Sequence, residues 1–183
     1  MPMPAEAEAL PGESGLAAFN AMSDMEAATA LRDCCTSTRW IDVVATGRPY
    51  RERDDLFATS DRAVDLLGRE DLDEALAGHP RIGDRPASGT WSASEQRGMA
   101  SASTDVQERI VAGNRAYEEM FGHVYLVCAS GKSAEELLSI LTSRLGNDPE
   151  TERVVVMDEL AKINRIRLAN LLDQLDQLDD RQG

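Results

Sequence analysis

Apolar residues recur three and four positions apart along most of this chain, in short runs separated by glycine, proline and capping residues. Positions with that spacing share one face of a helix, so the pattern predicts a succession of amphipathic α-helices. Gly47, Gly68 and Gly78 are expected to end three of these helices, and Asp24 is expected to cap another. The predicted helices cover residues 16–22, 25–35, 40–47, 56–67, 71–77 and, in the longest case, 149–178.

Helix starts are marked more clearly in the second half of the chain. Ser92 and Glu95 stand in the S-x-x-E arrangement of a capping box, and so do Ser133 and Glu136. In the run Gly-Asn-Asp-Pro at 146–149, the glycine suits the end of one helix, the aspartate caps the next and the proline begins it. These signals predict three helix starts, the last being that of the long C-terminal helix.

One stretch interrupts the helical pattern. Residues 123–130 read HVYLVCAS, a short apolar, β-branched run. No second strand is evident to pair with it, and an isolated strand is unstable, so we expect a buried extended segment near 123–129. The predicted fold class is all-α: a single-domain bundle of about eight helices over residues 14–178. Tails are expected at 1–13, as a disordered segment, and at 179–183.

Length and charge narrow the range of functions. A chain of 183 residues is long enough for one domain with a proper core. Its formal net charge of −14 argues against nucleic acid as a partner, because phosphate binding needs a basic face. No stretch approaches the ~20 apolar residues of a membrane helix, so no membrane partner is expected.

Cysteine usage and the two ends of the chain predict a cytoplasmic location. Cys34, Cys35 and Cys128 are odd in number and two are adjacent, which makes a poor disulfide framework and favours a reducing compartment. The first residues lack the basic start and apolar run of a secretory signal, and the last four are no peroxisomal address. There is no CxxC and neither histidine has paired ligands nearby, so no metal site is expected.

The segment 78–102 is the first candidate for chemistry. It holds His79, one of two histidines, in a loop broken by glycine and proline that leads to the predicted helix start at Glu95. A histidine titrates near neutral pH and therefore suits proton transfer. The alternative to a chemical role is a structural one for each residue. In that case His79 would only bond to the backbone of a turn, and Ser92 and Glu95 would only cap a helix.

Arg167 is the second candidate. At about 100° per residue it falls in the middle of the apolar stripe of the last helix, whereas Arg165 points elsewhere. A guanidinium on a core-facing stripe is costly unless an anion meets it. That partner is either a protein carboxylate, or the carboxylate or urea-type carbonyl of a substrate, which the planar fork of arginine suits. The stripe consists of Val156, Leu160, Ile163 and Leu171.

Taken together, these motifs resemble the 2-oxo-4-hydroxy-4-carboxy-5-ureidoimidazoline (OHCU) decarboxylases over about residues 16–172. The ordered series, more specific than any of its members, is His79-Pro80-Arg81-Ile82-Gly83, Ser94-Glu95-Gln96, Ala100-Ser101-Ala102, Asn114-Arg-Ala-Tyr117-Glu118, Phe121-Gly122, Val127-Cys128-Ala129, Gly131-Lys132-Ser133 and Lys162-Ile163…Arg167-Leu168. Three departures from the family pattern stand out. Arg81-Ile82 replaces the Asp-Leu of many members, His123 replaces an apolar residue, and the span from His79 to Glu95 is shorter than in the animal members.

The resemblance implies an all-helical decarboxylase, usually a homodimer, that converts the small molecule OHCU to (S)-allantoin and CO2 in the last step of urate degradation. It implies His79 as the catalytic histidine, Glu95 as its acidic partner and Arg167 as the third catalytic residue. No cofactor is implied, because the substrate carboxylate lies beside a ring C=N that accepts the electrons. The implied substrate-binding residues are Pro80, Ser92, Gln96, Tyr125, Leu126, Val127, Cys128 and Ala129.

Two other functions stay open on the sequence. One is a related lyase that acts on another ureido or hydantoin acid with the same site. The other is a helical binding module without activity, for which His79, Glu95 and Arg167 need not meet in one pocket.

Overall fold

The computed structural model describes residues 13–82 and 103–179. Within these ranges the chain forms eight α-helices and no strand, which confirms the predicted all-α class. The helices are α1 (Glu13–Ala21), α2 (Asp24–Cys34), α3 (Thr38–Thr46), α4 (Arg53–Asp65), α5 (Arg69–Ala77), α7 (Thr104–Phe121), α8 (Ala134–Arg144) and α9 (Pro149–Asp179).

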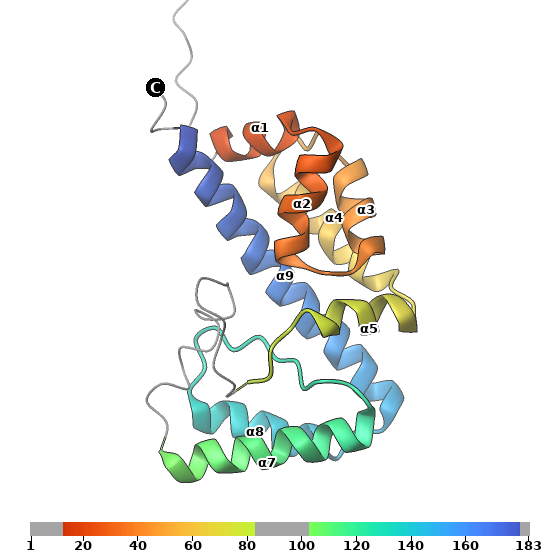
Figure 1. Ribbon diagram of the computed structural model, residues 1–183, viewed down its shortest axis with the longest axis vertical. Coiled ribbons are helices and arrows are strands. Elements are labelled where there is room, and N and C mark those ends of the chain that lie inside the picture. Colours follow the sequence, from red (N-terminus) through yellow and green to blue (C-terminus); the bar gives the residue numbers. More distant parts are fainter. Residues whose placement is uncertain (1–12, 83–102, 180–183) are drawn as a thin grey trace, which may run out of the picture.

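Helix α9 is the axis on which the other elements are arranged (Figure 1). Over its 31 residues it contacts α1 and α2 in its C-terminal half and α4 along much of its length, while α7 and α8 pair with each other at the opposite end of the molecule. Helix α5 lies between these two groups and contacts α3. The fold therefore has an upper group of helices, a lower pair, and a waist at α5.

Two hydrophobic cores meet at the segment between α7 and α8, which is extended as predicted. Leu126 and Cys128 belong to the larger core, formed mainly by α1–α5 and α9. Tyr125, Val127 and Ala129 belong to the smaller core, formed mainly by α7 and α8. Side chains of an extended chain point alternately to opposite faces, and this alternation joins the two cores.

The start of α2 differs by one residue from the prediction. Its N-cap is Ser23, not Asp24. The reason is a capping box absent from our sequence interpretation: the Ser23 hydroxyl accepts from the Glu26 N–H at 3.3 Å, and the Ser23 N–H donates to the Glu26 carboxylate at 2.9 Å. Asp24 is instead a first-turn acidic residue, where it favours the helix dipole.

The predicted signals around α8 and α9 are confirmed. The Ser133–Glu136 capping box is formed, and Asp148 accepts from the N–H groups of Glu150 and Thr151 at 3.0 Å each. Pro149 is the first residue of α9. The predicted capping box at 92–95 lies outside the described residues, as do all but one residue of each expected tail.

Helix α1 is pinned to the C-terminal part of α9. Ser14 donates its hydroxyl to Asp176 at 2.6 Å, the Gly15 N–H bonds the same carboxylate, and Arg53 of α4 reaches it at 2.7 Å. Gly15 allows this approach, since a Cβ there would lie far inside contact distance of the Leu172 carbonyl oxygen.

Replacing Gly15 by alanine is therefore expected to destabilise the fold by about 1–3 kcal/mol, because backbone rather than a flexible side chain must move. Urea denaturation measures this loss. Gly146→Ala is the matched control: its new Cβ would lie 3.4 Å from the nearest atom, the Ser143 oxygen, and we expect little change. Equal stabilities of the two variants would contradict the close α1–α9 packing.

Candidate active site

His79 follows directly on the end of α5 and is held there by backbone. Its N–H donates to Leu76 O at 3.0 Å, and its Nδ1 lies 2.9 Å from Ala75 O. A carbonyl only accepts, so Nδ1 carries a hydrogen, and Nε2 is the basic nitrogen of the neutral ring. The side chain is buried, with 7% exposure for the residue. The bond to backbone expected of a structural histidine is present, and it also fixes the tautomer that proton transfer through Nε2 needs.

The residues after His79 are docked on α7. Arg81 binds Glu118 through two bonds of 2.5 and 2.8 Å, and the Asn114 amide donates to Ile82 O at 2.7 Å. The hydrogen bond and charge of Arg81 hold the pKa of Glu118 below its usual value. These contacts show how Arg81-Ile82, a departure from the family pattern, is accommodated, and they fix the position of Pro80 between His79 and Arg81.

Arg167 lies in the core, as its place on the apolar stripe predicts. Only 4% of the residue is exposed, and its Nη1 donates to Cys34 O at 2.9 Å. Burial raises the pKa of the Cys34 thiol to about 12, although the nearby Arg167 charge opposes the rise. Cys34 and its neighbour are thus small buried groups and not activated thiols.

The turn between α2 and α3 links Arg167 to His79. At one end of this turn, Cys34 O accepts from Arg167. At the other end, the Thr36 hydroxyl lies 2.7 Å from Glu74 O and 3.2 Å from Ala75 O, and His79 Nδ1 also meets Ala75 O. Two of the three predicted catalytic side chains are therefore connected to residues 34–36, Arg167 directly and His79 through Ala75 O. Glu95, Ser92 and Gln96 lie outside the described residues.

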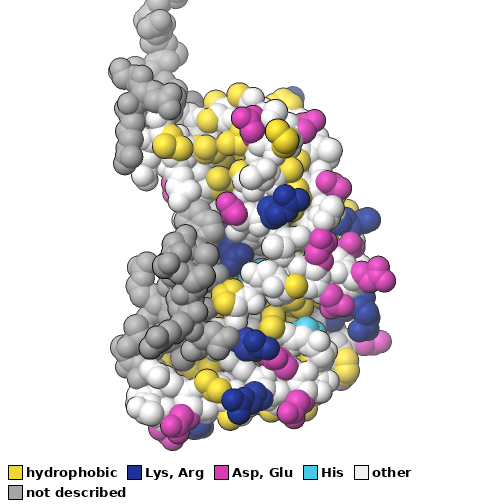
Figure 2. All heavy atoms as spheres, viewed as in Figure 1, with side chains coloured by type: hydrophobic (Ala, Val, Ile, Leu, Met, Phe, Trp, Pro, Cys, Tyr) yellow, Lys and Arg dark blue, Asp and Glu magenta, His cyan; other side chains and the backbone are white. Residues whose placement is uncertain are grey.

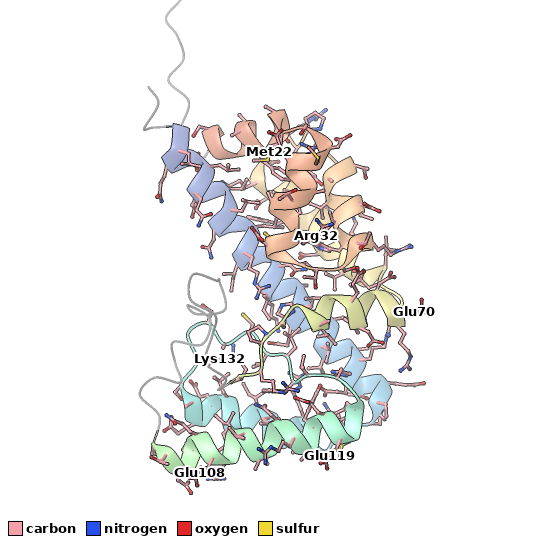
Figure 3. All side chains as sticks on the ribbon, in the orientation of Figure 1. Met22, Arg32, Glu70, Glu108, Glu119 and Lys132 are labelled. Atoms are coloured by element: carbon pink, nitrogen blue, oxygen red, sulfur yellow. The ribbon has the colours of Figure 1, made fainter. Side chains whose placement is uncertain are left out.

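Three charged side chains hold one edge of the extended segment. Glu159 of α9 accepts from the Cys128 N–H, Lys132 donates to Cys128 O, and Arg144 donates to Leu126 O, each at 2.7 Å. Figure 3 labels Lys132 beside this segment. Alternate residues of an extended chain direct their backbone groups to opposite edges. The backbone groups of Tyr125 and Val127 therefore face the other edge, and they make no hydrogen bond within the described part of the chain.

A buried network fixes the position of Arg144. Its Nε and Nη2 donate to Glu152 Oε1 at 2.8 and 2.5 Å, and the Tyr117 hydroxyl bonds the same oxygen. Asn147 donates to the other Glu152 oxygen at 2.8 Å. Glu152 and Tyr117 are both 0% exposed, and burial raises the pKa of the Tyr117 hydroxyl. The network joins α7, α8 and α9 and reaches the extended segment through Leu126 O.

The buried stripe of α9 needs one correction and several additions. Leu171 is half-buried, and the deeply buried positions beyond Arg167 are Leu168 and Leu172, because the stripe drifts around this long helix. Arg165 points away as predicted, binding Asp61 at 2.7 Å. Four side chains that the sequence analysis missed lie on buried faces or beside the extended segment: Arg144, Glu152, Glu159 and Asn164.

The surface offers little that suggests a different kind of site. Lys, Arg, Asp and Glu side chains are interspersed on the face in Figure 2, consistent with ion pairs such as Arg39–Asp71 and Arg81–Glu118. Within 13–82 and 103–179, no three His, Cys, Asp or Glu side chains gather as metal ligands would. None of the helices described is both long and apolar enough for a membrane span.

Comparisons with known proteins agree on one family. The sequence model of the OHCU decarboxylase family matches residues 20–169. An OHCU decarboxylase from Amia calva is 29% identical over 135 residues, covering 70% of this chain and 77% of the relative. The uric acid degradation bifunctional protein of Arabidopsis thaliana is 28% identical over 145 residues; the match covers 75% of this chain but only 45% of that protein. A crystal structure of an OHCU decarboxylase in the presence of (S)-allantoin superposes with a TM-score of 0.71 at 27% identity, covering 82% of this chain and 99% of that one.

Proposed function

Since this chain belongs to the OHCU decarboxylase family, we propose that it converts OHCU to (S)-allantoin and CO2 without a cofactor, within urate degradation. The observation that carries the proposal is that buried Arg167 and buried His79 are both anchored at one turn, residues 34–36, Arg167 through Cys34 O and His79 through Ala75 O. A histidine can transfer a proton and an arginine can bind a carboxylate or carbonyl oxygen, so the two side chains offer the two functions that this reaction needs.

The reaction requires that the substrate is held in one orientation and that a proton is delivered to one face of a ring carbon. The bond between the ring carbon and the carboxyl group breaks, and its electron pair passes into the adjacent ring C=N as CO2 leaves. Protonation of the carbon that becomes the stereocentre, from one face only, then gives the S enantiomer. A protein accelerates such a step by orienting the substrate, placing charge and delivering the proton.

His79 is proposed to engage the hydroxyl and carboxylate end of the substrate and to manage the proton. Ala75 O holds Nδ1, which leaves Nε2 as the nitrogen that performs this transfer. Glu95 is proposed as the acidic partner of His79. Pro80 is proposed to line the site beside His79, with Ser92 and Gln96 as further contacts.

Arg167 and the extended segment are proposed to hold the ureido and ring carbonyls. Arg167 supplies only donors, which suits carbonyl and carboxylate oxygens. Within residues 125–129, the protein itself uses Leu126 O, both backbone groups of Cys128 and Ala129 O. We therefore place the main backbone contacts at Tyr125 and Val127, with the Ala129 N–H on the same edge.

The proposal includes a small-molecule substrate, a homodimeric state and a cytoplasmic location. The family supports the substrate class and the dimer. All three cysteines are free and buried, which suits a reducing compartment.

The test is to generate the labile substrate in situ from urate and to follow circular dichroism as allantoin forms. With the protein present, we expect optically active allantoin to appear in the S form, whereas spontaneous decay protonates both faces and gives the racemate. A reaction without protein is the control. No enantiomeric enrichment would exclude the proposed function, and ligand binding without turnover would favour the binding module.

A further inference from the structure

Asn164 is a buried amide whose polar atoms are not satisfied by the described structure. It lies in α9, one turn before Arg167, and is 0% exposed. Neither its Nδ2 nor its Oδ1 makes a hydrogen bond of ordinary geometry in the described part of the chain. Its polar neighbour is the thiol of Cys35, a weak hydrogen-bonding group. A buried amide whose polar neighbour bonds so weakly costs about 1–3 kcal/mol, so an apolar residue would serve a purely structural role better.

The position of this amide is tied to the candidate site. Cys35 is the middle residue of the turn that links Arg167, through Cys34 O, to His79, through Thr36 and Ala75 O. Burial raises the pKa of the Cys35 thiol, and hydrogen bonding to the Ser37 backbone and the Asn164 amide opposes that rise. Asn164 therefore packs against the same turn that brings His79 and Arg167 together.

An amide supplies the hydrogen-bond acceptor that Arg167 lacks. Arg167 has five donors and no acceptor, and the neutral His79 ring offers one acceptor at Nε2. A ureido or hydantoin-like group presents N–H donors next to carbonyl oxygens, and it needs both kinds of partner. The side chain of asparagine carries an acceptor and a donor side by side, which matches that pair of atoms.

We propose that Asn164 is a substrate-binding residue, whose amide pairs with the N–H and C=O of a urea-type group of the ligand beside Arg167. This inference rests on the proposed function, because it assumes a ureido-substituted ring as the ligand. On this basis the buried amide lowers the stability of the free protein, and the ligand supplies its missing hydrogen-bond partners on binding.

Asn164→Leu tests the inference, since it replaces the two polar atoms with methyl groups. We expect the free variant to be at least as stable to urea as the parent protein, because the unsatisfied amide is gone. We expect kcat/KM for in situ OHCU to fall about 10- to 100-fold, mostly through KM, as two hydrogen bonds are lost. Affinity for (S)-allantoin, measured by calorimetry, should fall by a similar factor.

Two further variants keep the test decisive. Asn164→Ala cannot clash, so it replaces the leucine variant if leucine prevents folding, and the same loss of (S)-allantoin affinity is expected. Asn170→Leu is the matched control, because it makes the same change at a half-buried position of α9 and should leave both constants unchanged. Parental KM and (S)-allantoin affinity in a folded Asn164 variant would overturn the inference alone. An inactive parent protein would instead overturn the proposed function, and the inference with it.

Discussion

Replacing His79 by asparagine is expected to lower kcat/KM by about 100- to 10,000-fold, the usual range for loss of a general acid–base group. An asparagine amide can still donate to Ala75 O, as His79 Nδ1 does, so the end of α5 should keep its geometry. What it cannot do is exchange a proton at the position of Nε2. The loss should appear mainly in kcat, measured by circular dichroism of the allantoin formed.

The second histidine provides the control. His123 is half-buried, and its Nδ1 lies 3.0 Å from Val124 O, so it also combines a backbone contact with an imidazole. His123→Asn should retain nearly full activity, because this ring packs edge-on against Tyr117 rather than beside Arg167. Full activity in a folded His79→Asn variant would remove His79 from the mechanism, whatever the variant of His123 does.

Helical periodicity and end signals predicted the fold well because they depend on neighbouring residues. The capping box at Ser133 and the Asp148-Pro149 start both form through contacts two or three residues apart. The extended segment was also predictable. A short β-branched run favours an extended backbone, and no second strand was evident to pair with it. The error at Asp24 has the same local origin: two adjacent residues can both cap, and Glu26 decides for Ser23.

Prediction of the site was limited because these sequence signals depend only on neighbouring residues. Arg167 was found because a polar side chain on an apolar stripe is unusual. The same rule applies to Glu152 and Asn164, which also lie on the buried stripe of α9. Arg144 likewise continues the buried face of α8. Periodicity indicates that such a residue is buried, but not what it meets. Arg144 and Glu152 lie on either side of a helix break, so no single helical wheel pairs them.

Glu152→Gln is expected to destabilise the protein by about 3–5 kcal/mol, the range for breaking a buried ion pair from one side. The substitution keeps the volume of Glu152 but leaves the Arg144 guanidinium, 6% exposed at its side chain, without its counter-charge. Urea denaturation at neutral pH measures the loss. Asp158→Asn is the control: it removes one partner of an exposed pair with Lys162, for which less than about 1 kcal/mol is expected. Losses of similar size in the two variants would contradict a special role for the buried pair.

The double variant Arg144→Met/Glu152→Leu separates the two tasks of this network. Apolar side chains of similar size remove both buried charges together, so much of the stability lost in Glu152→Gln should return. The donor to Leu126 O is lost in the double variant, because methionine has no N–H to replace Arg144 Nη1. We therefore expect a folded protein whose extended segment is less firmly held and whose KM is higher than that of the parent protein. A parental KM in the stable double variant would mean that the pair serves the core alone, whereas a raised KM would mean that it also positions residues 125–129 for the substrate.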